Sequence, residues 1–538
     1  MKIYAISMDR NIIAIGFRRV VAAAKQAGYK IDSIYFLDYD DKASLAGSWW
    51  QQKTGVGFSV NYIQNDSAIR KLGELLSDGD VIAFSLMSVQ RNIGKKICDE
   101  IRRVNPKAKI IIGGYHPTLD PEDCISFCDI LIQGEGERAF VKFLNRVRDG
   151  SEITGIPNTW VNTGTEIHKH PRAPLMSADE LEKMPFMDYT LEDQFFFSYE
   201  TGELRPVTMQ KFLTHVGTTY NTIWSVGCPH RCSFCSQSKF IDLDKDYAKY
   251  RGPSPEYIIK EIKEVMKSFP IDYVIFYDSN FLGRSEEELA RFAELFKREI
   301  GIKFILSGTN PVSVTKRKFE ILTNSGLCRI KIGIEAANTD ILKLYRRAAQ
   351  IPTIKNALAI LSEFKNRMAA PALEVILDNP METVSNLYDS IQLLGELSPP
   401  FTMNLFSLQF MPYTELSEKY ASEDIVKSHI DKEYMFSYRP TAINILISIF
   451  AVIHPPRFLL RSMLMLIKGR EERLYPRLKS IFYKCSLIRR ALNQARFGDY
   501  STFPWYIMLT YHRVKALFSK LNFLSRRIGY SRKEPEIS

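Results

Sequence analysis

The strongest constraint on the fold is an alternation of short apolar runs with segments of helical period, found in two separate stretches of the chain. In the first stretch, strand-like runs cover residues 2–8, 30–37, 81–86, 109–114 and 129–134, and helical segments cover 16–27, 89–104 and 137–147. Strands that are apolar throughout and alternate with helices indicate a parallel sheet covered on both faces. We therefore predict a doubly wound α/β domain over residues 1–148, binding ligands at the carboxyl ends of its strands.

The second stretch covers residues 206–424 and repeats the alternation six times. Its strand-like runs are 222–226, 273–278, 303–308, 329–335, 373–377 and 404–410, and its helical segments are 255–268, 285–299, 315–324, 352–364 and 383–397. Six such units predict a partial (β/α)6 barrel of the TIM type, with its active site at the carboxyl ends of the strands. Residues 149–205 have no clear period and hold several Pro and Gly, so we expect a linker with short strands.

Residues 425–538 have a helical and basic character without a strand pattern. Residues 441–538 carry 18 Lys or Arg against 5 Asp or Glu, so the chain's net charge of +11 comes from this region. A basic tail binds anionic lipid, nucleic acid or an acidic partner. Nucleic acid is disfavoured because no RNA-binding module is appended. The segment 513–530, with Leu517, Leu521 and Leu524 beside its cations, fits either a membrane surface or packing on the barrel.

The longest apolar run, residues 441–453, is shorter than the ~20 residues that span a bilayer, and it contains Asn444. The first residues lack the pattern of a signal peptide. We therefore expect a cytoplasmic protein, with peripheral contact at the inner membrane face as the alternative that the tail suggests.

Three of the eight cysteines, Cys228, Cys232 and Cys235, form a C-x3-C-x2-C group just after the first predicted barrel strand. Three thiolates on one short loop hold three corners of a [4Fe–4S] cluster and leave one iron open for chemistry. The alternatives are a zinc loop or three buried thiols, although zinc would want a fourth ligand and His230 is badly spaced for that role. The other five cysteines are scattered and fit buried free thiols.

The triplet and the barrel pattern resemble the radical S-adenosylmethionine (SAM) enzymes over about residues 222–420. The resemblance implies that the SAM amino and carboxylate groups chelate the open iron, and that reductive cleavage yields methionine and a 5′-deoxyadenosyl radical. It also implies SAM contacts by Phe234, Asp278 and Glu335. Loop packing, a helix cap and a solvated loop position are the respective alternatives for these residues.

Two later segments depart from the family's pattern. Its glycine-rich turn after the fifth strand is LDNPMET here, with Asp378 and Met381 in place of glycines. Its P-G-T-x-L segment after the sixth strand is PYTEL, with Tyr413 in place of glycine. Because a side chain makes the backbone less permissive, these changes put local SAM contacts and the substrate pocket in doubt, but not the cluster.

The first domain resembles the flavodoxin-like cobalamin-binding domains that precede radical SAM barrels, through IIGGYHPT (111–118) and QGEGE (133–137). The glycines fall at strand ends, where backbone approaches a ligand closely. The expected cobalamin-contacting residues are Ser85, Gly113, Gly114, His116, Gly134, Glu135 and Gly136. Asn11 stands where many cobalamin domains place a histidine, so we expect no histidine ligand to cobalt from this loop. A flavodoxin-like domain without a ligand is the alternative.

These resemblances imply a radical SAM enzyme with a [4Fe–4S] cluster, SAM and cobalamin as cofactors, and a one-electron reductant such as flavodoxin or ferredoxin as partner. The expected reaction is methylation of an unactivated carbon in a small or lipid-like metabolite. A cyclase or rearrangement enzyme of the same architecture is one alternative. A sensor protein that binds a cluster or cobalamin is another.

Overall fold

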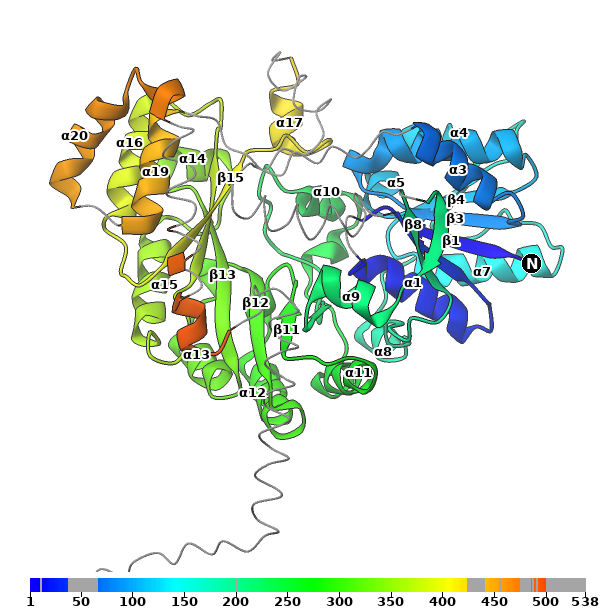
Figure 1. Cartoon of the computed structure of the whole chain (residues 1–538), viewed down its shortest axis with the longest axis horizontal. Coiled ribbons are helices and arrows are strands. Elements are labelled where there is room, and N and C mark those ends of the chain that lie inside the picture. The colour runs from blue at the N-terminus through cyan, green and yellow to red at the C-terminus, as the bar shows by residue number, and fades with distance from the viewer. Residues whose placement is uncertain are drawn as a thin grey trace, which may run out of the picture.

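The computed structural model describes residues 1–9, 12–36, 66–199, 201–422, 441–453, 456–474, 485, 488–489 and 492–499. Figure 1 shows two α/β parts side by side: an N-terminal part in blue and cyan, and a second part in green to yellow. The orange helices near the C-terminus lie on the side of the second part that faces away from the first.

Within the described residues, the N-terminal part is built on a nine-stranded sheet with the order β7-β6-β5-β4-β3-β1-β2-β8-β9. Its strands are β1 Ile3–Ser7, β2 Asp32–Tyr35, β3 Val81–Ser85, β4 Lys109–Gly113, β5 Ile130–Ile132, β6 Thr159–Asn162, β7 Ile167–Lys169, β8 Gln194–Ser198 and β9 Glu203–Pro206. The first five strands pair in parallel in the order 2-1-3-4-5, which confirms the predicted flavodoxin-like fold. The strand order reverses between β1 and β3, the point at which such sheets bind ligands.

Helices cover both faces of this sheet. They are α1 Ile15–Gln26, α3 Asp66–Leu75, η1 Ser88–Gln90, α4 Arg91–Val104, α5 Tyr115–Leu119, α6 Pro121–Ile125 and α7 Glu137–Arg148. Successive side chains of β1 enter opposite cores: Ile3 and Ala5 join the core that contains α1 and α7, and Tyr4 and Ile6 join the one that contains α3 and α4. Burial on both faces explains why these strands are apolar throughout.

Residues 149–205 extend the N-terminal sheet at both of its edges. Strands β6 and β7 add antiparallel to β5, and the chain then returns past α8 Ala178–Glu182 to the opposite edge. There β8 pairs in parallel with β2, and β9 pairs antiparallel with β8. The segment predicted to be a linker thus supplies four strands of the first sheet.

The second part contains a six-stranded, all-parallel sheet in sequence order, as a partial barrel requires. Its strands are β10 Thr219–Thr222, β11 Tyr273–Phe276, β12 Lys303–Thr309, β13 Leu327–Glu335, β14 Ala372–Leu377 and β15 Thr402–Ser407. Its helices are α9 Met209–Val216, α10 Ser236–Leu243, η2 Lys245–Ala248, α11 Pro255–Ser268, η3 Phe281–Gly283, α12 Glu286–Leu295, η4 Phe296–Ile300, η5 Pro311–Ser313, α13 Lys316–Thr323, α14 Thr339–Leu344, α15 Ile351–Glu363, α16 Val384–Leu394 and α17 Glu415–Lys419.

The first barrel strand differs from its prediction. It was expected over residues 222–226, but it ends at Thr222. The backbone N–H groups of Trp224 and Ser225 bond to the Asp278 carboxylate instead of to a neighbouring strand. The apolar residues beyond Thr222 therefore belong to the loop that carries the cysteines.

The described C-terminal residues pack against the barrel. Helix α19, Ala442–Ile453, contacts β15 and α16, and α20, Arg457–Ile467, packs on α19. Asn444, the polar residue in the apolar run, donates from Nδ2 to Asp378 Oδ1 at 2.6 Å. At the amino ends of the barrel strands, the Tyr273 hydroxyl donates to the Gly498 carbonyl at 2.8 Å. None of the described helices is long and apolar enough to cross a membrane.

Candidate functional site

The loop with Cys228, Cys232 and Cys235 follows the carboxyl end of β10. Its entry requires glycine at 227: φ is +96°, and a Cβ there would lie 2.0 Å from the Lys249 carbonyl oxygen. Cys228 N donates to the Tyr247 carbonyl at 3.0 Å. The loop is thereby pressed against residues 247–249, which follow α10.

The three thiols are free, and they lie close enough together that a negative charge on Cys232 or Cys228 raises the pKa of Cys235. Burial raises the pKa of Cys228, and raises that of Cys235 to about 12. Thiolates on this loop therefore need a positively charged partner, which iron supplies. Arg347 donates from Nη1 to Cys232 Sγ at 3.3 Å, so one of the three sulfurs already has a cationic hydrogen-bond donor.

Asp278, which was predicted to contact SAM, holds the backbone just before the cysteine loop. Its carboxylate accepts hydrogen bonds from Trp224 N at 3.0 Å, Ser225 N at 2.6 Å and Ser225 Oγ at 2.5 Å. Asp278 is only 1% exposed, and burial raises its pKa while the hydrogen bonds oppose that shift. Both carboxylate oxygens are thus committed to the backbone that leads to Cys228.

Glu335 and Phe234 lie in the same region of the barrel. Glu335 ends β13 with φ at +62°, and its Oε1 lies 3.8 Å from Arg347 Nη2. Burial raises the pKa of Glu335 to about 7, although the Arg347 guanidinium lowers it. The Phe234 ring packs edge-on against Tyr345 at 5.1 Å between centroids. Arg347 therefore lies between Glu335 and a sulfur of the cysteine loop, and contacts both. Sequence reasoning missed this residue.

A cavity of about 400 Å³ opens at the carboxyl ends of the N-terminal sheet. Of the predicted cobalamin contacts, six line this cavity: Ser85, Gly113, Gly114, Gly134, Glu135 and Gly136. Gly114 and Gly134 have positive φ, a backbone conformation that explains why glycine stands at both positions. Gly113 and Gly136 have no positive φ, and a Cβ there would meet nothing closer than 3.6 Å. Their missing side chains leave room in the cavity.

His116 is not among the described residues that line the cavity, and its predicted contact with cobalamin stays a prediction. It is 5% exposed, and its Nε2 lies 3.1 Å from Asp123 Oδ2. Helix α5 begins at Tyr115 and turns the next side chain toward α6. Cys124 lies close enough to complete a ligand-like trio. However, Arg91 bonds both oxygens of Asp123, so these groups form a hydrogen-bonded cluster, not an open cation site.

Thr118 also lines the cavity, and sequence reasoning missed it. Its Oγ1 donates to the Gly114 carbonyl at 2.7 Å and accepts from Gly134 N at 2.9 Å. One hydroxyl therefore bonds both the segment 113–114, which ends β4, and the segment 134–136, which follows β5. We call these two segments the glycine turns. A threonine in a short helix carries no sequence signal for such a role, which depends on two strand ends meeting in space.

The cavity is shared between the two parts of the molecule. Val226 and Gly227, directly before Cys228, line it together with the N-terminal residues. Arg251 of the barrel donates to Glu135 Oε1 at 2.8 Å, and Gln237 donates to the Tyr115 hydroxyl at 2.9 Å. The cavity in the first domain therefore meets the segment that carries the cysteines.

Comparison with known proteins finds one family match in each of the two parts of the molecule. The sequence matches the radical SAM superfamily over residues 222–372 and the B12 binding domain over residues 1–144. The chain is a radical SAM protein with a cobalamin-binding domain. These two domains imply a [4Fe–4S] cluster, SAM and cobalamin as cofactors.

Curated relatives of this radical SAM protein include the uncharacterized methyltransferase PH0819 of Pyrococcus horikoshii, 22% identical over 49% of this chain and 54% of that protein. The anaerobic magnesium-protoporphyrin IX monomethyl ester cyclase of Cereibacter sphaeroides is 22% identical over 66% of this chain and 58% of that protein. The matches thus span about half the length of these relatives. The radical SAM methyltransferase TsrM of Kitasatospora setae has the same fold, with a TM-score of 0.59, 13% identity, and coverage of 78% and 76%.

The residues present fit the implied cofactors. Three free, buried-to-half-buried thiols on one loop match the ligand set of a cluster with one open iron. Along the cavity, Glu137 Oε2 and Arg251 Nη2 are buried without a hydrogen-bond partner within the described residues. Unpaired buried polar atoms are costly, and the amide groups on the corrin rim of cobalamin would satisfy them. The expectation that Asn11 replaces a histidine ligand lies outside the described residues.

Proposed function

We propose that this radical SAM protein is a cobalamin-dependent methyltransferase that acts on an unactivated carbon of a small or lipid-like metabolite. The observation that carries the proposal is the shared cavity, which is lined by the glycine turns of the cobalamin domain and by Val226 and Gly227 beside the cysteines. Radical generation and methyl donation have to occur close together, and this arrangement brings their two sites to one space.

Each group of residues has a defined role in the proposal. Cys228, Cys232 and Cys235 hold the cluster, and Phe234 and Glu335 contact SAM. Together with SAM, the cluster supplies a carbon radical by one-electron reduction, with flavodoxin or ferredoxin as electron donor. Arg347 hydrogen-bonds Cys232, which stabilises the electron-rich state of the sulfur. Asp278 fixes the backbone before Cys228 and is not assigned to SAM.

The test is anaerobic reconstitution with iron, sulfide and cobalamin, followed by addition of SAM and a strong reductant. We expect 5′-deoxyadenosine from the native protein, no 5′-deoxyadenosine from Cys232→Ala, and unchanged formation from Cys328→Ala, a buried free thiol on β13. Absence of this product from the native protein, even with cell extract as a substrate source, would favour a sensor role.

Methylation and cyclisation leave different by-products. Methylation consumes a second SAM and releases S-adenosylhomocysteine, whereas a cyclase or rearrangement enzyme does not. The relative named as a cyclase supports keeping this alternative. Accumulation of 5′-deoxyadenosine without S-adenosylhomocysteine in the presence of extract would select the cyclase.

We further propose that the C-terminal region contacts an anionic membrane surface, from which a lipid-like substrate would come. Helix α20 buries Leu460 and Ile467 but exposes Phe458 by 78% and Met465 by 75%. Phe458 and Met465 are seven residues apart and so share one helix face. Large exposed apolar side chains in a basic region are typical of helices that lie at a membrane surface. The predicted apolar stripe of residues 513–530 lies outside the described residues.

A further inference from the structure

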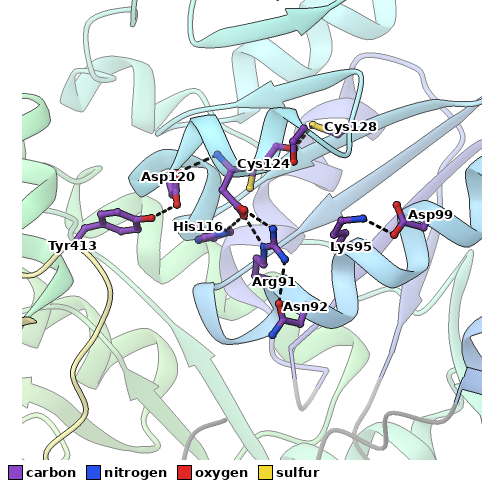
Figure 2. Close-up of polar contacts among 11 residues, drawn as sticks. Arg91, Asn92, Lys95, Asp99, His116, Asp120, Cys124, Cys128 and Tyr413 are labelled. Atoms are coloured by element: carbon purple, nitrogen blue, oxygen red, sulfur yellow. Dashed lines mark hydrogen bonds and ion pairs between the residues drawn. The ribbon is translucent and has the colours of Figure 1, made fainter. Parts of the chain in front are cut away.

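The segment Tyr413–Lys419, which we call the brace, follows the last barrel strand and touches both cofactor-binding regions. At one end, the Tyr413 hydroxyl donates to the carboxylate of Asp120 in the cobalamin-binding domain (Figure 2). The two residues are 293 positions apart in sequence. At the other end, Leu416 N donates to the Ser233 carbonyl at 2.8 Å.

Ser233 places the brace on the cysteine loop itself, because it follows Cys232 directly. Its N–H donates to the Tyr345 carbonyl at 3.0 Å, and its hydroxyl donates to the Leu344 carbonyl at 2.7 Å. Thr414 caps α17 and is 2% exposed, so the turn between Tyr413 and Leu416 is well held. Residues 414–416 therefore fix where Tyr413 lies relative to the cysteine loop.

Asp120 is equally well connected to the cavity. Its other oxygen caps α6 by accepting from Asp123 N at 3.2 Å. Its own N–H donates to the His116 carbonyl at 2.7 Å and closes α5. That helix carries Thr118, whose hydroxyl joins the glycine turns that line the cavity. A shift of Asp120 would therefore shift the lining of the cavity.

The backbone at Tyr413 gives an independent indication. Its φ is +64°, a conformation that glycine adopts freely but that is sterically unfavourable for a residue with a Cβ. The family's pattern has glycine at this position, where this chain has tyrosine. A side chain kept at a strained position indicates that its contact has a use, and the contact made here is the one to Asp120.

We propose that Tyr413 is a positioning residue that holds the cobalamin-binding domain in register with the cysteine loop. The inference rests on the proposed function for its purpose, since a methyl donor has to lie close to the site of radical formation. Tyr413 touches no cofactor in this scheme. It acts through Asp120 and α5 on one side, and through Leu416 and Ser233 on the other.

The test compares Tyr413→Phe with Tyr4→Phe in the full-length, reconstituted protein. Both variants remove one hydroxyl that donates to an aspartate, but the Tyr4 bond to Asp78, at 2.8 Å, lies within the N-terminal domain. Hydrogen exchange is read for residues 115–125 and 413–419. We expect exchange in both segments to become roughly tenfold faster in Tyr413→Phe and to stay unchanged in Tyr4→Phe.

A second variant separates the crossing bond from local folding. Asp120→Ser keeps a residue that caps α6 but is too short to reach Tyr413. We expect it to accelerate exchange as Tyr413→Phe does, and the double variant to add nothing further, because both changes remove the same bond. Unchanged exchange in Tyr413→Phe, or additive effects in the double variant, would overturn the proposal.

A spectroscopic readout addresses the relative position of the cofactors. With cobalt as cob(II)alamin and the cluster reduced, spin relaxation of the cobalt depends on its distance from the cluster. We expect a broader distribution of relaxation rates in Tyr413→Phe than in Tyr4→Phe, and equal distributions would contradict the positioning role. Neither readout requires turnover. Failure of the native protein to form 5′-deoxyadenosine would therefore refute the proposed function while these measurements still decide the role of Tyr413.

Discussion

Replacing Asp278 with asparagine distinguishes a loop anchor from a SAM contact. The carboxylate accepts bonds from Trp224 N on one oxygen and from Ser225 N and Oγ on the other. Asparagine has a single acceptor oxygen, so its amide N–H would face one of these buried donors. The change loses a charge-assisted hydrogen bond, worth about 1.5–3 kcal/mol, and leaves a buried donor unpaired, at about 1–3 kcal/mol.

We therefore expect Asp278→Asn to lower the stability of the barrel by about 3–5 kcal/mol, a large part of the ~5–15 kcal/mol typical of a domain. Because the anchored backbone leads directly to Cys228, iron bound per chain after reconstitution should fall several-fold. The matched control is Asp242→Asn, which breaks a half-exposed ion pair with Arg231 and should cost at most about 1 kcal/mol.

The assays are chemical denaturation of the protein before reconstitution and iron content after it, with SAM binding measured by equilibrium dialysis. A variant with native stability and full iron loading, but with weakened SAM binding, would refute the anchor and restore Asp278 as a SAM contact. Loss of stability and iron together, with SAM binding falling only in proportion to the iron, is the result that the geometry predicts.

Three further predictions concern the cysteine loop, the cavity and the C-terminal region. Gly227→Ala should abolish iron loading because its Cβ would lie 2.0 Å from a backbone oxygen, whereas Gly217→Ala, also at positive φ but with open space around it, should load iron normally. Gly113→Val should fill the cavity and reduce cobalamin retained per chain, measured by absorbance, by about tenfold or more, yet leave SAM cleavage intact; full cobalamin retention would contradict the assigned site. Phe458→Ser should reduce flotation with anionic liposomes at low salt, whereas Ile167→Ser, an exposed control on β7, should not; equal flotation would exclude the α20 face.

The sequence predicted those features that depend on local pattern. The helix 255–268 was placed with the bounds that the structure shows, because Pro255 begins it after a Ser cap and its apolar face is regular. The cysteine loop and the glycine turns were found for the same reason: spacing along the chain fixes which residues share a loop or end a strand.

Features that depend on tertiary contact could not be read from the sequence. Arg347 reaches Cys232 across 115 residues, and Asp278 reaches Ser225 across 53. His116 directly follows the glycine pair and Tyr115, and a short helix turns its side chain toward Asp123. In each case the partner lies on another element, so no local period or spacing reveals it.

The path of residues 149–206 has a consequence for how this cobalamin-binding domain can be transferred to other proteins. The same segment pairs with β5 at one edge of the sheet and with β2 at the other. A chain shortened to residue 148 would leave both of these edges unpaired, and unpaired edges of this kind invite aggregation. A graft of the domain onto another catalytic module would therefore have to include the segment through Pro206, where β9 ends.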